Sequence, residues 1–246
     1  DYEWLNSLFN GIVIEKNPLI ASSVVSYFSM PLQTYQGMER TLAEKKLLHI
    51  ALSHALGSCR TQLMRVLIAN HVSPMLSEQL YEIWNKQNNE QLNENDYTTL
   101  AYELCVRCPE KCNDILSTQR MRITNPDRLR QFDFISRAVV SNTTQLDLLF
   151  NSLLMAENRR IEPWTAMTLS YLNHFSRGDY AVKYIRPALE ALQDVQRTGD
   201  IFSQHRSKAA WLEVNKFLKE HPDYPQLLRT KILQAVYPLY RLYGRN

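Results

Sequence analysis

Glycine is scarce in this chain, with only 6 glycines among 246 residues. β-Sandwiches and phosphate-binding α/β folds depend on glycine in their turns and loops, so both fold classes are disfavoured. Cysteine is also rare: 4 residues are too few for a disulfide scaffold of this length. No run of about 20 apolar residues is present, so we expect no membrane span.

Neither sign of charge is in clear excess, because 28 Lys and Arg face 25 Asp and Glu, a net charge of +3. The basic stretch around Arg120, Arg122, Arg128 and Arg130 is typical of a solvated helix face paired with nearby acids. Aromatic residues follow the apolar stripes and do not interleave with basic residues as on a nucleic-acid platform. We therefore expect no nucleic-acid partner.

What the chain has is helical periodicity, supported by 45% apolar residues and by abundant good helix formers. The clearest apolar stripe recurs at the i, i+3, i+4, i+7 spacing of a buried helix face, behind a predicted N-cap at Ser141 or Asn142. Its members are Leu146, Leu149, Phe150, Leu153 and Leu154. Two similar stripes are Leu48, Ala51, Leu52 and Ala55, and Leu228, Ile232, Ala235, Val236 and Leu239. No strand-like alternation exceeds four residues, so the sequence predicts an all-α fold.

Prolines and polar breaks divide this pattern into about ten to twelve short helices. Asn125-Pro126 and Glu162-Pro163 are typical helix starts, whereas Pro187 and Pro238 should kink or end a helix just upstream. We predict one domain over 1–246, with a possible sub-boundary near 120–125. The helices form either a HEAT-like α-solenoid of stacked antiparallel pairs or a compact irregular domain, and periodicity alone does not choose between them.

Three cysteines lie close together in the sequence. Cys105, Cys108 and Cys112 have the spacing C-x2-C-x3-C, which on a continuous helix directs three thiols to one face, as a metal centre requires. However, Pro109 should end the helix after Cys108, and a fourth ligand would have to come from distant Cys59 or a histidine. We favour burial of these thiols in the core and keep a metal or cluster site as the alternative.

Catalytic motifs are missing from the chain. It contains no H-E-x-x-H, no G-x-S-x-G and no glycine-rich phosphate loop. His49 and His54 are five residues apart and do not share a helix face well, and we interpret all six histidines as surface or packing residues. The residues therefore predict no catalytic group, no metal ligand and no cofactor within this chain.

Several segments, in this order and spacing, resemble the C-terminal helical domain of aminopeptidase N-like zinc metallopeptidases of the bacterial branch. The resemblance covers roughly residues 40–243, and its segments begin at Leu80, Leu92, Asn125, Glu162, Tyr171, Val182, Gln196, His221 and Leu228. It implies an α-solenoid that covers a separate zinc-bearing catalytic domain of the same polypeptide and lines the chamber where the peptide substrate lies. The segment from Ser203 to Glu220 is shorter here than in those relatives.

That resemblance gives expectations for two arginines. Basic groups on the concave face would attract a peptide carboxylate, and Arg186 and Arg197 are the candidates for that face. The alternative is that Arg197 and Asp200 simply brace a helix junction. Because the chain opens at Asp1 within a helical pattern, we expect a piece of a longer polypeptide, whose compartment these residues do not decide. A standalone HEAT-like protein-binding scaffold is the competing interpretation of the whole chain.

Overall fold

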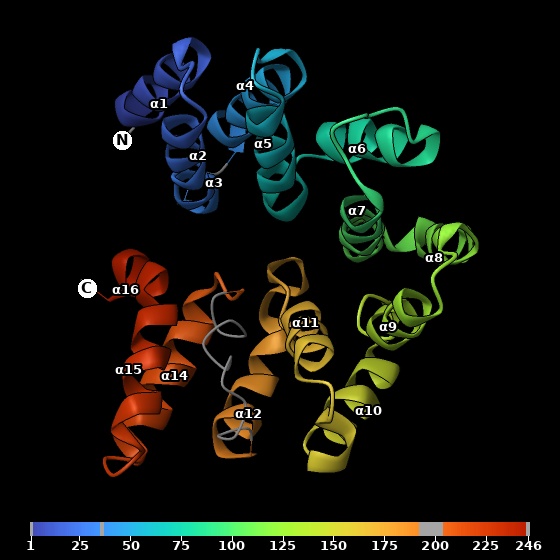
Figure 1. Ribbon diagram of the computed structural model, residues 1–246. Coiled ribbons are helices and arrows are strands. Elements are labelled where there is room, and N and C mark those ends of the chain that lie inside the picture. The colour runs from blue at the N-terminus through green and yellow to red at the C-terminus, as the bar shows by residue number, and fades with distance from the viewer. Residues whose placement is uncertain (1, 35–36, 192–203, 245–246) are drawn as a thin grey trace. The chain divides into compact units, whose positions relative to one another are not determined.

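The computed structural model describes residues 2–34, 37–191 and 204–244, and these residues divide into two compact units (Figure 1). The first unit spans 1–119 and the second spans 120–246, so the division falls next to the predicted interval 120–125. The described residues form helices and contain no strand. The all-α prediction is therefore confirmed. No helix within these ranges is both long and apolar enough to cross a membrane.

The first unit is a series of helices joined by short connections. They are α1 (Tyr2–Ile14), α2 (Pro18–Ser26), α3 (Ser29–Thr34), α4 (Gly37–Ser53), α5 (Gly57–Asn70), α6 (Pro74–Lys86), α7 (Glu94–Arg107), the 3-10 turn η1 (Pro109–Lys111) and α8 (Cys112–Arg122), which continues across the division. α5 packs against α2, α4 and α7, and α6 packs against α7. The core of this unit therefore surrounds α5, with Leu63, Met64 and Leu67 fully buried.

The second unit is also a series of short helices joined by short connections. They are α9 (Pro126–Ser136), α10 (Thr143–Leu153), η2 (Ala156–Arg159), α11 (Glu162–Leu172), η3 (Phe175–Tyr184), α12 (Ile185–Ala191), α14 (Lys208–Glu220), α15 (Gln226–Ala235) and α16 (Tyr237–Tyr243). α11 packs against α9 and α10, and α14 packs against η3, α12 and α16. Several helices have only six or seven residues, so the described ranges hold more helices than the ten to twelve predicted.

Asparagine caps explain where many of these helices begin. The Asn142 side chain accepts a hydrogen bond from the Gln145 backbone at the start of α10, and Asn125 caps α9 in the same way. Asn93 and Asp96 form a reciprocal capping box at α7. The predicted start at Asn125 is therefore confirmed, and of the two predicted caps Ser141 and Asn142 the structure uses Asn142.

Prolines set other helix boundaries. α15 ends at Ala235 and α16 begins at Tyr237, one residue before Pro238. Pro187 lies in the first turn of α12, directly after η3. Since proline tolerates a first helical turn but not a helix interior, both predicted interruptions are confirmed.

Candidate functional site

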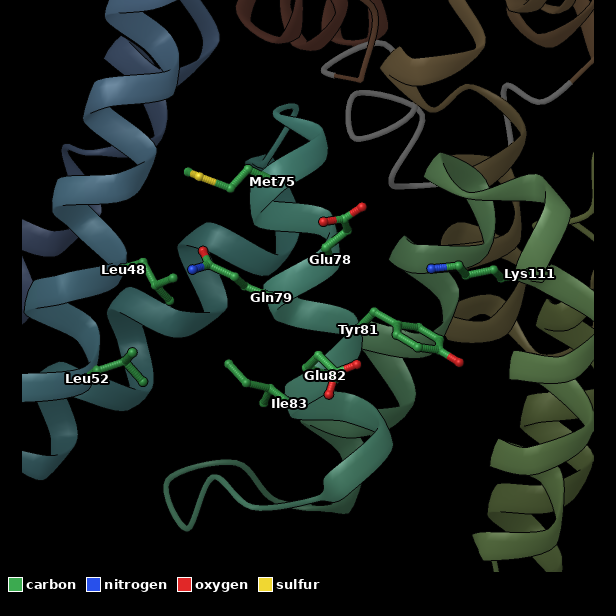
Figure 2. Close-up of a pocket in the computed structure, with 9 residues that line it drawn as sticks. All are labelled: Leu48, Leu52, Met75, Glu78, Gln79, Tyr81, Glu82, Ile83 and Lys111. Carbon is green, nitrogen blue, oxygen red and sulfur yellow. The ribbon is translucent and has the colours of Figure 1, made fainter.

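A groove in the first unit runs along α6 between α4 and η1 (Figure 2). We call it the α6 groove; its lining residues are Leu48, Leu52, Met75, Glu78, Gln79, Tyr81, Glu82, Ile83 and Lys111. Its volume is about 590 Å³, which lies within the usual size range of ligand pockets.

The side of the groove toward α4 is apolar. Leu48 and Leu52 point from α4 toward α6, where Gln79 and Ile83 face them (Figure 2). Leu48 is 6% exposed, but Leu52 is 54% exposed. The sequence stripe placed both leucines and Ala55 on one buried face, which is wrong for Leu52 and Ala55. α4 ends at Ser53, and its other buried residues, such as Leu47 and Ala51, turn the core-facing side away from Leu52.

The opposite side of the groove is charged. Glu78 and Glu82 lie one turn apart on the exposed surface of α6. The Glu82 carboxylate pairs with Lys86 Nζ at 2.8 Å, and this ion pair lowers the pKa of Glu82. Lys111 Nζ lies 4.3 Å from the centre of the Tyr81 ring, a cation–π contact. Within the described ranges no ion pair engages Glu78, and the two carboxylates Glu78 and Glu82 are balanced by the cations Lys86 and Lys111.

A buried ion pair fixes the turn that precedes α6. Glu44 and Arg40 lie one turn apart on α4, almost without exposure, and Arg40 Nε donates to Glu44 at 2.7 Å. The Glu44 carboxylate also accepts from the backbone nitrogens of Val72 at 2.8 Å and Ser73 at 3.0 Å. Arg40 in turn donates to the backbone oxygen of Asn70. A single buried pair thereby satisfies three backbone groups at the end of α5 and in the α5–α6 connection.

A second buried pair reaches the same connection from α7. Arg107 donates to Glu103, one turn earlier on α7, and its Nε donates to the backbone oxygen of His71 at 2.8 Å. The His71 ring is fully buried, and its Nδ1 lies 3.0 Å from the backbone oxygen of Ile68. Within the part of the chain described, His71 Nε2 has no hydrogen-bond partner. Burial, followed by the nearby Arg107 charge, lowers the pKa of His71 to about 3.

The neutral state of His71 makes the first unit sensitive to acid. An unfolded histidine protonates near pH 6.5, whereas the folded ring stays neutral down to about pH 3. In this window the unfolded chain binds one more proton, so stability falls as the pH drops, by about 1.4 kcal/mol per pH unit at most. We expect His71→Gln to flatten the decline of urea-induced unfolding free energy below about pH 6.5. His49→Gln, at an exposed site, is the control, and equal slopes in both variants would contradict the assignment.

The cysteine cluster lies where α7 ends and α8 begins. Cys105 and Cys112 are buried, Cys108 is partly exposed, and the Cys105 thiol donates weakly to the Cys112 backbone oxygen at 3.5 Å. Contact with Cys112 and burial raise the pKa of Cys105, so this thiol stays protonated. α7 ends at Arg107, as the proline after Cys108 predicted. Among the described residues no set of three His, Cys, Asp or Glu side chains is placed to hold a metal ion.

Of the two arginines predicted to face a peptide, Arg186 lies among the described residues. Arg186 lies on α12, where Nε contacts Glu213 and Nη1 contacts Glu220, both at 2.8 Å. Hydrogen bonds to these two carboxylates raise its pKa, and its guanidinium also covers the Phe217 ring at 5.6 Å. Its charge is therefore already matched by two carboxylates. Arg197 lies outside the described residues.

Other polar residues that we interpreted as packing or surface groups form hydrogen bonds and ion pairs within the protein. His54 Nε2 lies 2.7 Å from the backbone oxygen of Ile12, and buried His205 lies 2.9 Å from the Asn173 side chain. In the basic stretch, Arg120 pairs with Asp133 at 2.8 Å on the exposed surface. These contacts agree with the interpretation of such residues as packing or solvated groups.

Comparison with protein-family models, with curated proteins and with solved structures finds no match to this chain.

Proposed function

We propose that this chain is the non-catalytic helical domain of a zinc aminopeptidase, in which stacked helices cover the chamber of a separate catalytic domain and limit or guide peptide access. The observation that carries the proposal is the ordered set of segments that resembles the aminopeptidase N-like C-terminal domain. Two of these segments begin at helix starts, because Asn125 caps α9 and Glu162 begins α11; the segment that begins at Val182 contains Pro187, which lies in the first turn of α12.

The packing within each unit supports a HEAT-like solenoid. Most helix pairs in extensive contact are near neighbours in chain order, such as α4 with α5, α6 with α7, α9 with α11 and α12 with α14, whereas α2 packs against α5 across two intervening helices. Such near-neighbour packing is typical of stacked helical repeats, which present long surfaces without needing a catalytic constellation. This architecture suits a domain that encloses a reaction performed by another domain.

In this proposal zinc belongs to the catalytic domain of the parent polypeptide. That domain would supply an H-E-x-x-H helix, a downstream glutamate ligand and a G-x-M-E-N-type loop that reads the substrate N-terminus. Arg186 would act mainly as a brace between α12 and α14, because Glu213 and Glu220 already hold its guanidinium. The residues of this chain would contribute the surface that covers the chamber of the catalytic domain.

The coding sequence upstream of Asp1 tests this proposal at little cost. We expect an open frame that encodes H-E-x-x-H and the additional glutamate. A frame without metallopeptidase motifs would reject the aminopeptidase proposal. It would favour the second candidate, a standalone protein-binding scaffold, which the open α6 groove supports because apolar concavities on a helical array are common binding sites.

A further inference from the structure

We propose that the outer surface of α14 and α16 binds anionic membranes peripherally, with leucine and tyrosine side chains among the lipid headgroups and lysine and arginine side chains against their negative charges. We call this surface the terminal patch. Its residues are Lys208, Leu212, Lys216, Tyr237, Tyr240 and Arg241. The inference does not rest on the proposed aminopeptidase role, since it concerns only the last helices of the second unit.

The outer face of α14 combines apolar and cationic side chains. Lys208, Leu212 and Lys216 follow one another at a spacing of about one turn, and all three are exposed, Leu212 by 56%. The opposite face of the helix carries Val214 and Phe217, which are buried in the core. Exposed leucine next to lysine is the combination that holds a protein at an anionic lipid surface.

Aromatic rings continue this surface onto α16. Tyr237 and Tyr240 are 53% and 42% exposed, and Arg241 is exposed one turn after Tyr237. The Tyr240 ring lies 5.7 Å from the ring of Trp211, the neighbour of Leu212 on α14, and 6.1 Å from the ring of Tyr237. These ring contacts connect the exposed surfaces of the two helices. Tyrosine is enriched at membrane interfaces because its ring is apolar and its hydroxyl is polar.

The charge of this end of the chain is not balanced. Residues 204–244 contain seven lysines and arginines but only three carboxylates, a net charge of +4. Two of these carboxylates, Glu213 and Glu220, contact Arg186 of α12 at 2.8 Å, and the third, Asp223, lies in the turn after α14. The sequences of α15 and α16 contain no acidic residue. Charge complementarity therefore favours an anionic partner.

The apolar side chains favour a lipid surface over a nucleic acid. A nucleic acid is held by phosphate contacts and by bases that stack on aromatic faces, so the exposed leucine at position 212 would have no role in binding it. At a membrane, leucine and tyrosine enter the boundary between headgroups and acyl chains, while each nearby lysine or arginine adds electrostatic attraction. Both kinds of residue in the terminal patch then contribute.

The test is vesicle co-sedimentation with the full 246-residue chain. Phosphatidylcholine vesicles with about 30 mol% phosphatidylserine should bind about tenfold or more tightly than phosphatidylcholine alone, and about 0.5 M salt should remove most of this difference. Lys208→Gln combined with Lys216→Gln should weaken binding to the anionic vesicles about tenfold, because two cations are lost. Leu212→Ser should weaken it about fivefold or more, because less apolar surface enters the lipid.

Matched controls come from other parts of the chain. Lys16→Gln combined with Lys45→Gln makes the same change in net charge at two exposed lysines of the first unit. Leu148→Ser alters a leucine of α10 that is 66% exposed. Both controls should leave vesicle binding unchanged, with circular dichroism showing equal helicity in all variants.

Four results would overturn the proposal. They are equal binding to neutral and anionic vesicles, equal loss in test and control variants, binding of a single-stranded oligonucleotide or of polyglutamate without binding of anionic vesicles, and a dimer in gel filtration that Leu212→Ser dissociates. The last result would show that a second copy of the chain, and not a membrane, covers the terminal patch.

Discussion

Glu44→Ala should strongly destabilise the first unit around the α5–α6 connection. Glu44 is fully buried and accepts hydrogen bonds from Arg40, Val72 and Ser73, so its removal leaves a buried guanidinium without its carboxylate and two backbone nitrogens without acceptors. Breaking one side of a buried ion pair costs about 3–5 kcal/mol. Because a whole domain is stable by only about 5–15 kcal/mol, the loss is a large fraction of the total.

Hydrogen exchange followed by mass spectrometry measures this effect where it occurs. Peptides from α5, the turn at residues 70–73 and α6 should exchange much faster in Glu44→Ala, whereas Glu82→Ala should change little, because Glu82 forms the same kind of one-turn pair on the open surface. Replacing both partners, as Arg40→Met with Glu44→Leu, removes the unpaired buried charge but leaves the backbone nitrogens of Val72 and Ser73 without acceptors, so it should recover only part of the lost protection. Equal exchange in Glu44→Ala and Glu82→Ala would show that the buried pair does not hold this connection.

Arg177→Ala should have the corresponding effect in the second unit. The Arg177 guanidinium donates to three backbone oxygens, from Nε to Tyr171 at 2.9 Å, from Nη1 to Val140 at 3.3 Å and from Nη2 to Ala138. It thus ties η3 to the end of α11 and to the segment after α9. Hydrogen bonds with a charged partner contribute about 1.5–3 kcal/mol each, and since such contributions are not additive we expect a total loss of about 2–4 kcal/mol.

Urea titration followed by circular dichroism would detect that loss as a lower unfolding midpoint. Arg177→Lys should not rescue it, because a single ammonium group does not present the planar fork that reaches three carbonyls. Arg137→Ala removes an exposed arginine nearby and is the matched control. If Arg177→Lys were as stable as the unchanged chain, the positive charge and not the geometry of the guanidinium would account for the stabilisation.

Local signals in the sequence predicted the helices well. Asn125 and Asn142 predict the starts of α9 and α10, because an N-cap side chain needs only the backbone of the next turn. Pro187 and Pro238 predict interruptions, because proline disrupts the helix in which it lies. These are short-range effects, so a single sequence contains the information that determines them.

The groove and the buried pairs were not predictable in the same way. Leu52 continues an apolar stripe in the sequence, and only the tertiary packing of α4, which buries Leu47 and Ala51, leaves Leu52 exposed. Glu44 contacts a turn 28 to 29 residues later, and Arg177 contacts a segment 37 to 39 residues earlier. Contacts over such separations depend on tertiary packing, and hydrophobic periodicity and helix propensity carry no information about tertiary packing.

In our proposal this chain encloses a reaction that another domain performs. Release of N-terminal amino acids, measured with zinc present, tests it most directly by comparing the full parent polypeptide with residues 1–246 alone. We expect release by the parent, with stoichiometric zinc bound, and no release by the isolated chain. Zinc-dependent release by residues 1–246 alone, or a parent that neither binds zinc nor cleaves peptides, would contradict it.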